Sequence, residues 1–108
     1  RVGQLLVDGG RDVLPSAFVD DIFDGGDPRL WALGDFASFL PGGAYRSSWY
    51  APRTQPGVVC GIGIHGQLLY VDRVRRVVVA KLSTWPEPDD ETGDAVAIAI
   101  SAAIAAAL

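Results

Sequence analysis

The chain has 108 residues, of which 49% are hydrophobic and 20% are charged, and its formal net charge is −4. This length suits one domain, and this balance of apolar and charged residues is typical of a folded globular protein. The acidic balance and the lack of a basic stripe argue against a nucleic-acid-binding surface. The single cysteine, Cys60, excludes an internal disulfide and a cysteine-rich metal site.

The first segment is predicted to be helical. Residues 2–10 fit the last turns of an amphipathic helix that is closed by Gly9 and Gly10. The sequence begins within this helical pattern, which suggests that residues 1–108 are the C-terminal portion of a longer domain. We therefore expect the remaining part of that domain to precede Arg1.

A second helix is predicted after Pro15, with Phe18, Val19 and Ile22 on one apolar face. Residues 27–44 follow, where apolar residues and turn residues mix without a clear period. A segment of this length inside a compact domain is typical of a pocket wall, a lid or an irregular cap.

From Tyr45 onward the pattern predicts strands at residues 45–50, 58–64, 68–72 and 77–82, joined by short connections. Short connections require antiparallel neighbours, so about four strands should form a meander. The last strand is an almost unbroken apolar run, which is typical of a central strand covered on both faces.

A C-terminal helix is predicted from about Asp90 to Leu108, since Pro86 and Pro88 block an earlier start. Its alanine-rich run is shorter than the roughly 20 apolar residues that cross a bilayer, so we expect a buried helix and no membrane contact. The predicted fold is α+β, an antiparallel meander packed against this helix with a shorter helix before it.

Residues 60–67, Cys-Gly-Ile-Gly-Ile-His-Gly-Gln, hold the only histidine of the chain, His65. Cys60 and His65 would lie about 16 Å apart on a straight strand, which argues against a thiol–imidazole pair. The string Gly-x-Gly-x-x-Gly from Gly61 runs into a strand instead of a helix, so it lacks the context of a phosphate-binding loop. One histidine and scattered aspartates give no metal-ligand spacing, and we expect neither a metal nor a cofactor.

No serine of the chain has a lysine three residues later, and none lies in a Gly-x-Ser-x-Gly elbow. The alternate glycines Gly61 and Gly63 remain as the informative feature. They remove side chains from one face of a strand and leave its backbone N–H groups open. Such a strand can bind an oxyanion, or it can make room for a closely packed neighbour.

The order of these segments resembles the C-terminal part of the serine β-lactamase-like hydrolases. The resemblance rests on Gly-Ile-His-Gly-Gln, then Leu-Leu-Tyr-Val-Asp, a turn, Val-Val-Val-Ala-Lys-Leu-Ser and Trp85-Pro86. It extends over essentially the whole chain and is strongest toward the 6-aminohexanoate-dimer hydrolases. It implies that residues 1–108 are the C-terminal portion of a β-lactamase/transpeptidase-like fold.

The resemblance also implies roles for the glycine-spaced strand. Gly63 would be the glycine of the family's third motif, Ile64 would donate its backbone N–H to the oxyanion, and His65 would begin the turn beyond. The basic and hydroxyl positions of that motif fall on Gly61 and Ile62. Without that cation the site should bind the carboxylate of a β-lactam poorly. A linear amide or ester substrate is therefore favoured over the substrates of a β-lactamase or D,D-peptidase.

The family's Ser-x-x-Lys nucleophile motif and its tyrosine motif would lie upstream, so this chain alone is expected to be inactive. Tyr45 begins a Tyr-x-Ser string that we interpret as coincidental. Gly63, His65 and Tyr45 are candidate contacts to a small amide or ester substrate in the intact protein. His65 can equally be a hydrogen-bonded structural residue, and Tyr45 a core residue.

The expected partners are the missing N-terminal part, or a second copy, covering the sheet. A cytoplasmic location is expected. Two other functions stay open: a non-catalytic interaction module whose glycine strand packs on a partner, and a degenerate homologue that has lost its nucleophile.

Overall fold

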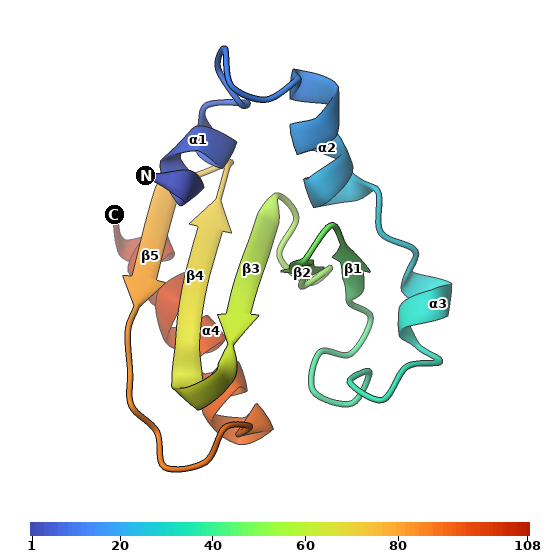
Figure 1. The fold of residues 1–108 in the computed structure, drawn as a ribbon, viewed down its shortest axis with the longest axis vertical. Coiled ribbons are helices and arrows are strands. Elements are labelled where there is room, and N and C mark those ends of the chain that lie inside the picture. Colours follow the sequence, from blue (N-terminus) through green and yellow to red (C-terminus); the bar gives the residue numbers. More distant parts are fainter.

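Five antiparallel strands lie side by side in the order in which they occur in the chain, in a computed structural model that describes residues 1–108 (Figure 1). They are β1 (Ala44–Arg46), β2 (Trp49–Ala51), β3 (Val58–Gly63), β4 (Gln67–Asp72) and β5 (Val77–Lys81). The α+β meander predicted from the sequence is confirmed. Within residues 1–108 β5 lies at an edge of the sheet and not in the central position predicted for the last strand.

Residues 45–50 form a hairpin and not the single strand that was predicted. β1 and β2 pair from Ala44↔Ala51 to Arg46↔Trp49, with Ser47 and Ser48 between them. Both serines have positive φ values, 50° and 70°. A tight two-residue turn requires such values, and glycine or asparagine usually marks it in a sequence. The Ser-Ser pair is not typical of such a turn, so the turn was not predicted.

Helices α1 (Val2–Val7) and α2 (Ser16–Asp24) cover one face of the sheet near its upper end in Figure 1. α2 follows Pro15 as predicted, and Val19, Ile22 and Phe23 are its buried residues. Phe18 is 43% exposed, so its predicted place on the buried face is wrong. Phe23 lies one turn after Val19 and takes that place. These helices share a core with the face of the sheet that they cover: Leu6, Val7, Val19, Ile22, Phe23, Ala44, Ala51, Val59 and Val71.

Helix α4 (Glu91–Ala107) covers the opposite face and begins at Asp90, whose side chain accepts a hydrogen bond from Gly93 N–H at 2.9 Å. Its inner side packs on strand residues in a second core, which contains Val58, Cys60, Leu68, Tyr70, Ala97, Ile98 and Ala105. Its outer side is apolar and exposed, with Val96 at 53% and Ile100 at 56%, so the helix is not buried as predicted. No helix is both long and apolar enough to cross a membrane.

The short helix α3 (Pro28–Trp31) is the regular part of residues 27–43, and the rest of that segment forms turns. Asp27 begins α3 by accepting a hydrogen bond from Arg29 N–H at 2.9 Å. Trp31 Nε1 donates to Leu40 O at 2.8 Å, which ties the two ends of the segment together. The segment lies beside β1 and forms a wall at that side of the sheet.

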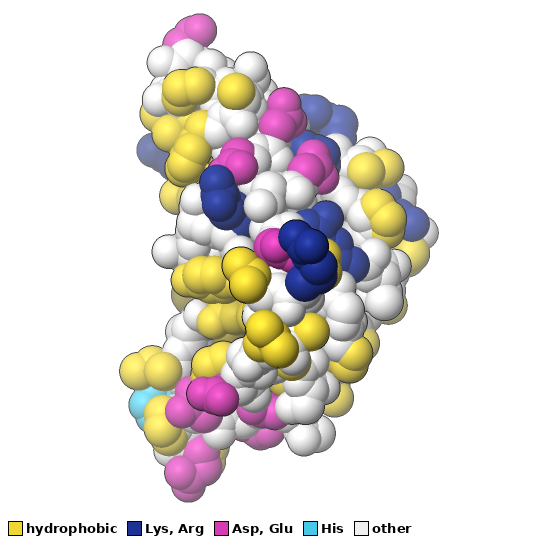
Figure 2. Space-filling model, turned by 90° about the vertical axis from the view of Figure 1, so that its right-hand side faces the viewer, with side chains coloured by type: hydrophobic (Ala, Val, Ile, Leu, Met, Phe, Trp, Pro, Cys, Tyr) yellow, Lys and Arg dark blue, Asp and Glu magenta, His cyan; other side chains and the backbone are white.

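Ion pairs join the β4–β5 turn to the helices on the first face. Arg73 donates to Asp20 at 3.0 Å and to Asp24 at 2.7 Å, and Arg76 donates to Asp8 at 2.7 Å. The hydrogen bond from Arg76 is the main cause of the lowered pKa of Asp8. Figure 2, which faces the right-hand side of Figure 1, shows acidic and basic side chains interspersed on that side of the molecule. Arg73 and Arg76 therefore tie α1 and α2 to the sheet.

Candidate functional site

Strand β3 is paired along its whole length on one side and over only part of it on the other. Its partner β4 matches every residue from Val58↔Asp72 to Gly63↔Gln67. On the other side β2 is paired only at Tyr50↔Cys60. The edge of β3 after Cys60 is therefore unpaired by any strand.

The register shows which backbone groups face this open edge. Arg73 N–H donates to Gly57 O at 2.9 Å, so the polar groups of Gly57 face β4. In an antiparallel ladder the side to which a residue's N–H and C=O point alternates from one residue to the next. Gly57 and Gly63 are an even number of residues apart, so the carbonyl of Gly63 also faces β4. The N–H of the same peptide unit belongs to Ile64 and points the opposite way. The Ile64 N–H is thus directed to the open edge.

The turn after β3 is a 3-10 turn, Ile64–Gly66, in which His65 has φ 58° and ψ 29°. This left-handed conformation is uncommon for a residue with a Cβ. His65 is half-buried, and its Nδ1 lies 2.8 Å from Trp85 O. A carbonyl can only accept, so Nδ1 carries the hydrogen and Nε2 is left without it in the neutral ring. His65 is therefore a hydrogen-bonded residue of the turn, whatever further contact it makes.

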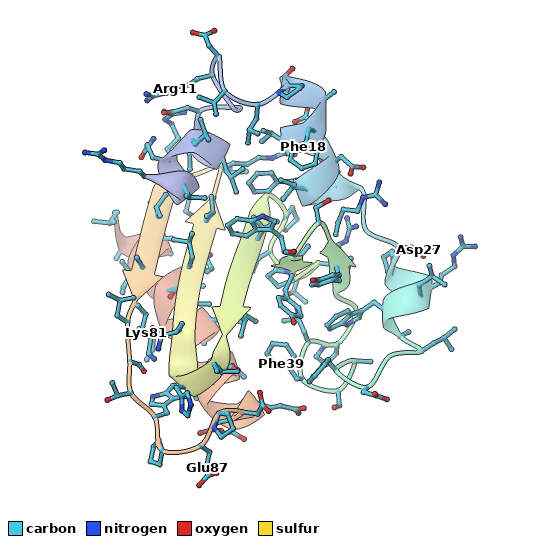
Figure 3. All side chains as sticks on the ribbon, viewed as in Figure 1. Arg11, Phe18, Asp27, Phe39, Lys81 and Glu87 are labelled. Carbon is cyan, nitrogen blue, oxygen red and sulfur yellow. The ribbon has the colours of Figure 1, made fainter.

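Gly63 and Ile64 line a hollow of about 400 Å³ at this end of the sheet. Its apolar wall includes Phe39, which Figure 3 shows beside the end of β3. Its other wall is the start of α4, which contributes Asp90 and Asp94. Burial, followed by the neighbouring charge of Asp90, raises the pKa of Asp94. The hollow thus combines a backbone donor, an aromatic wall and an acidic rim.

Tyr45 lies on β1, 47% exposed, and lines a neighbouring hollow of about 480 Å³ with Trp31 and other residues of the 27–43 segment. Its ring contacts Tyr50 edge-on with 5.0 Å between ring centres. Tyr50 and Phe36 line both hollows, so the hollows of Tyr45 and Ile64 adjoin. Tyr45 is a partly exposed wall residue and not a core residue.

The predicted site residues are therefore brought together only in part. Gly63 and Ile64 share one hollow and Tyr45 lies in the next, while His65 lines neither of them. Tyr50, which the sequence suggested as a pocket or core residue, joins the hollows. Sequence reasoning missed the contacts that Lys81 and Trp85 make with the turn. The sequence offered one signal for the last of these, the Trp85-Pro86 pair of the family pattern.

Cys60 offers no chemistry at this site. Its side chain is fully buried on the α4 face, and burial raises the pKa of the thiol to about 12. The thiol therefore stays protonated and unreactive at neutral pH. No group of three or more histidine, cysteine, aspartate or glutamate side chains is placed to hold a metal ion.

No family model matches this chain. Its similarity to a curated protein confirms the resemblance to the serine β-lactamase-like hydrolases. That protein is the 6-aminohexanoate-dimer hydrolase of Paenarthrobacter ureafaciens, and the chain is 38% identical to it over 93 residues. The match covers 82% of this chain and 24% of the relative, so the chain spans about a quarter of the relative's length.

Proposed function

We propose that residues 1–108 form the C-terminal portion of a serine hydrolase with a β-lactamase-like fold, which cleaves linear amide or ester bonds. The observation that carries the proposal is the Ile64 N–H at the unpaired edge of β3, in a chain that is 38% identical to a 6-aminohexanoate-dimer hydrolase. A backbone N–H in this position can stabilise the oxyanion that develops during acyl transfer. The expected place of action is the cytoplasm.

The reaction proceeds through an ester of an upstream serine. The serine oxygen adds to the substrate carbonyl carbon while its proton passes to an upstream lysine–tyrosine pair, and the resulting oxyanion accepts hydrogen bonds from the Ile64 N–H and the serine N–H. The C–N or C–O bond then breaks, and the amine or alcohol leaves with a proton supplied by the same pair. Water hydrolyses the acyl-serine and releases the acid. This chain contributes one oxyanion donor and a wall of the substrate site.

Substrate contacts are assigned to the two adjoining hollows. Gly63 permits a close approach of the substrate to the strand, because no side chain covers the backbone there. Tyr45 supplies an aromatic wall further along, whereas His65 lines neither hollow and is assigned no substrate contact. Gly61 and Ile62 provide no cation, which supports a substrate without a carboxylate at that point.

The rest of the polypeptide is assigned to the surfaces that this chain leaves open. β5 has a free edge, and next to it the outer side of α4 and Trp85 line an apolar hollow of about 430 Å³. A free strand edge and a contiguous apolar surface are both aggregation hazards in a monomer. The upstream part of the same polypeptide, or a second copy, is the proposed cover.

The proposal is tested in the complete polypeptide that contains this chain. Incubation with amide and ester substrates should give an acyl-serine adduct, seen by mass spectrometry, and residues 1–108 alone should give neither adduct nor turnover. Turnover by residues 1–108 alone would overturn the proposal.

Replacing Ile64 tests the donor itself. Ile64→Pro removes the N–H, and Gly63, at φ −128° and ψ 155°, already has the conformation that a residue before proline prefers. We expect kcat to fall by about 10²- to 10³-fold, as for the loss of one oxyanion donor. Ile64→Val is the matched control, because it keeps the N–H and alters a side chain that is 63% exposed. Equal kcat values for the two variants would remove Ile64 from the mechanism.

A second candidate function is a non-catalytic interaction module, and the exposed apolar side of α4 favours it. In that case the complete polypeptide should lack an acyl-serine but should bind a protein partner through this surface. Val96→Glu should weaken that binding, measured by analytical ultracentrifugation. The acyl-serine experiment therefore separates the two functions.

A further inference from the structure

The turn that presents Ile64 is fixed from outside by the segment that joins β5 to α4. Residues 82–90 contain no strand or helix, yet they bond to the turn at several points. His65 N–H donates to Pro88 O at 2.9 Å, and Trp85 N–H donates to His65 O at 3.2 Å. Both backbone polar groups of His65 are therefore bonded to one neighbouring segment.

Side chains add a second set of bonds between the same two segments. The carboxamide of Gln67 pairs with the backbone of Ser83: its Nε2 donates to Ser83 O at 2.6 Å, and Ser83 N–H donates to its Oε1 at 3.3 Å. Lys81 Nζ donates to Gly66 O at 2.7 Å and lies 4.1 Å from the centre of the Trp85 ring. These bonds continue the hydrogen bonding between β4 and β5 beyond the ends of the two strands.

The orientation of the Ile64 N–H is fixed as a result. Within its own peptide unit, the Gly63 carbonyl faces β4 opposite Gln67. In the next peptide unit, the His65 N–H is bonded to Pro88 O. With both flanks held, rotation of the Ile64 N–H away from the open edge requires these bonds to break.

We propose that His65, Gln67 and Lys81 are positioning residues that hold the Ile64 N–H in its donor orientation. They act through the turn and touch no reacting atom. This inference deepens the proposed function and rests on it. An oxyanion donor acts only when it is correctly aimed, and a misplacement of about 1 Å can cost about 10²-fold in rate.

His65 offers the sharpest test, because its role can be removed and then restored. His65→Ala loses the bond from Nδ1 to Trp85 O and leaves alanine in a left-handed conformation. His65→Asn is the conservative variant: asparagine tolerates that conformation, and its side-chain amide can donate to the same carbonyl. A polar residue that cannot donate a hydrogen bond to Trp85 O would not restore the conformation of the turn.

In the complete polypeptide, His65→Ala should lower kcat by about 10- to 100-fold and change KM by less than about twofold, because the donor acts in the transition state. His65→Asn should recover most of the lost kcat. In ¹⁵N-isoleucine-labelled protein, the amide resonance of Ile64 should shift in His65→Ala and return toward its original position in His65→Asn.

The matched control removes a side-chain hydrogen bond elsewhere in the same sheet. Tyr70 Oη donates to Gln55 Oε1 at 3.0 Å, far from the turn. Gln55→Ala should lower the Tm by an amount similar to His65→Ala while leaving kcat unchanged. An equal loss of kcat in Gln55→Ala would show that general destabilisation explains the effect, and it would overturn the positioning role.

The outcomes also separate this inference from the proposed function. If the unmodified polypeptide forms an acyl-serine but His65→Ala keeps its kcat, or His65→Asn restores neither kcat nor the Ile64 resonance, only the positioning role is wrong. If the unmodified polypeptide forms no acyl-serine from amides or esters, the proposed function is wrong and this role falls with it.

Discussion

The two halves of strand β3 differ in almost every physical respect. Val58, Val59 and Cys60 are at most 2% exposed and pack into the cores on both faces of the sheet. The half that follows, from Gly61 to Gly63, has small side chains or none on one face and an edge that no strand pairs. The first half stabilises the fold, whereas the second half leaves room for a ligand.

The difference shows how one strand can serve both stability and chemistry. The first half is held by burial, which supplies about 25 cal/mol per Å² of apolar surface. The second half is only partly buried and is held by its pairing with β4, while directional bonds from residues 81–88 fix the turn beyond it. Substitutions in the two halves should therefore have separable effects on stability and activity.

The largest expected effect concerns alkaline pH and Cys60, at the end of the buried half. Burial raises the pKa of this thiol from about 9 to about 12. Between these values the unfolded chain loses the proton and the folded chain keeps it, so stability falls as pH rises. One such group changes the free energy of unfolding by about 1.4 kcal/mol per pH unit, or roughly 4 kcal/mol in all.

Urea unfolding at a series of pH values measures this loss, with Cys60→Ala as the comparison. The variant should show a shallower decline above pH of about 9. Tyr70, whose pKa burial also raises to about 12, and Tyr50, whose pKa burial raises as well, contribute to the decline that remains. An unchanged slope in Cys60→Ala would mean that the thiol is accessible, and the contrast between the halves would weaken.

The next effect compares the two halves directly. Val59→Ala should lower the free energy of unfolding by about 2 to 3 kcal/mol, because it leaves a cavity in a core where Val59 is fully buried. Gly61→Ala should change it by less than about 0.5 kcal/mol, since a new Cβ would lie 3.5 Å from Trp49 and 3.8 Å from Leu69. Urea midpoints of both variants check the pair. Similar losses of unfolding free energy for the two variants would show that the two halves of β3 do not differ in their contribution to stability.

The smallest effect concerns the turn at the open end. Gly66 has φ +79°, and a Cβ there would collide with the Trp85 ring. Gly42 has φ +68° with nothing within 4 Å of a new Cβ. Gly66→Ala should cost about 2 kcal/mol and Gly42→Ala about 1 kcal/mol, which is the backbone cost alone. Thermal unfolding gives both values, and equal losses would mean that Trp85 does not constrain the turn.

Much of this fold can be predicted from local sequence patterns. The strands after residue 58, the turn before β5 and the start of α4 at Asp90 follow from apolar runs, prolines and an acidic cap. The Ser47-Ser48 turn did not, because serine is a weak signal for positive φ. The edge position of β5 also escaped prediction, since valine runs look alike at an edge and in the centre of a sheet.

Gly63 and Ile64 were proposed for the candidate site from the family resemblance, and the direction of the Ile64 N–H then followed from the register. The bonds from Gln67 to Ser83 and from His65 to Trp85 could not be predicted, because residues 16 to 20 positions apart are brought together only by the folded chain. No local pattern encodes such contacts.

The sequential strand order has a consequence for how the molecule assembles. Each strand pairs only with its neighbour along the chain, so every pairing closes a short loop at low entropic cost. Hairpins can therefore add one after another from β1 toward β5 as the polypeptide is synthesised. Helix α4 follows β5 in the chain, so it packs on a face whose strands are made before it. The turn after β3 gains its bonds to residues 82–90 only after β5 has been made, so the open end of β3 is the last part of the sheet to be fixed.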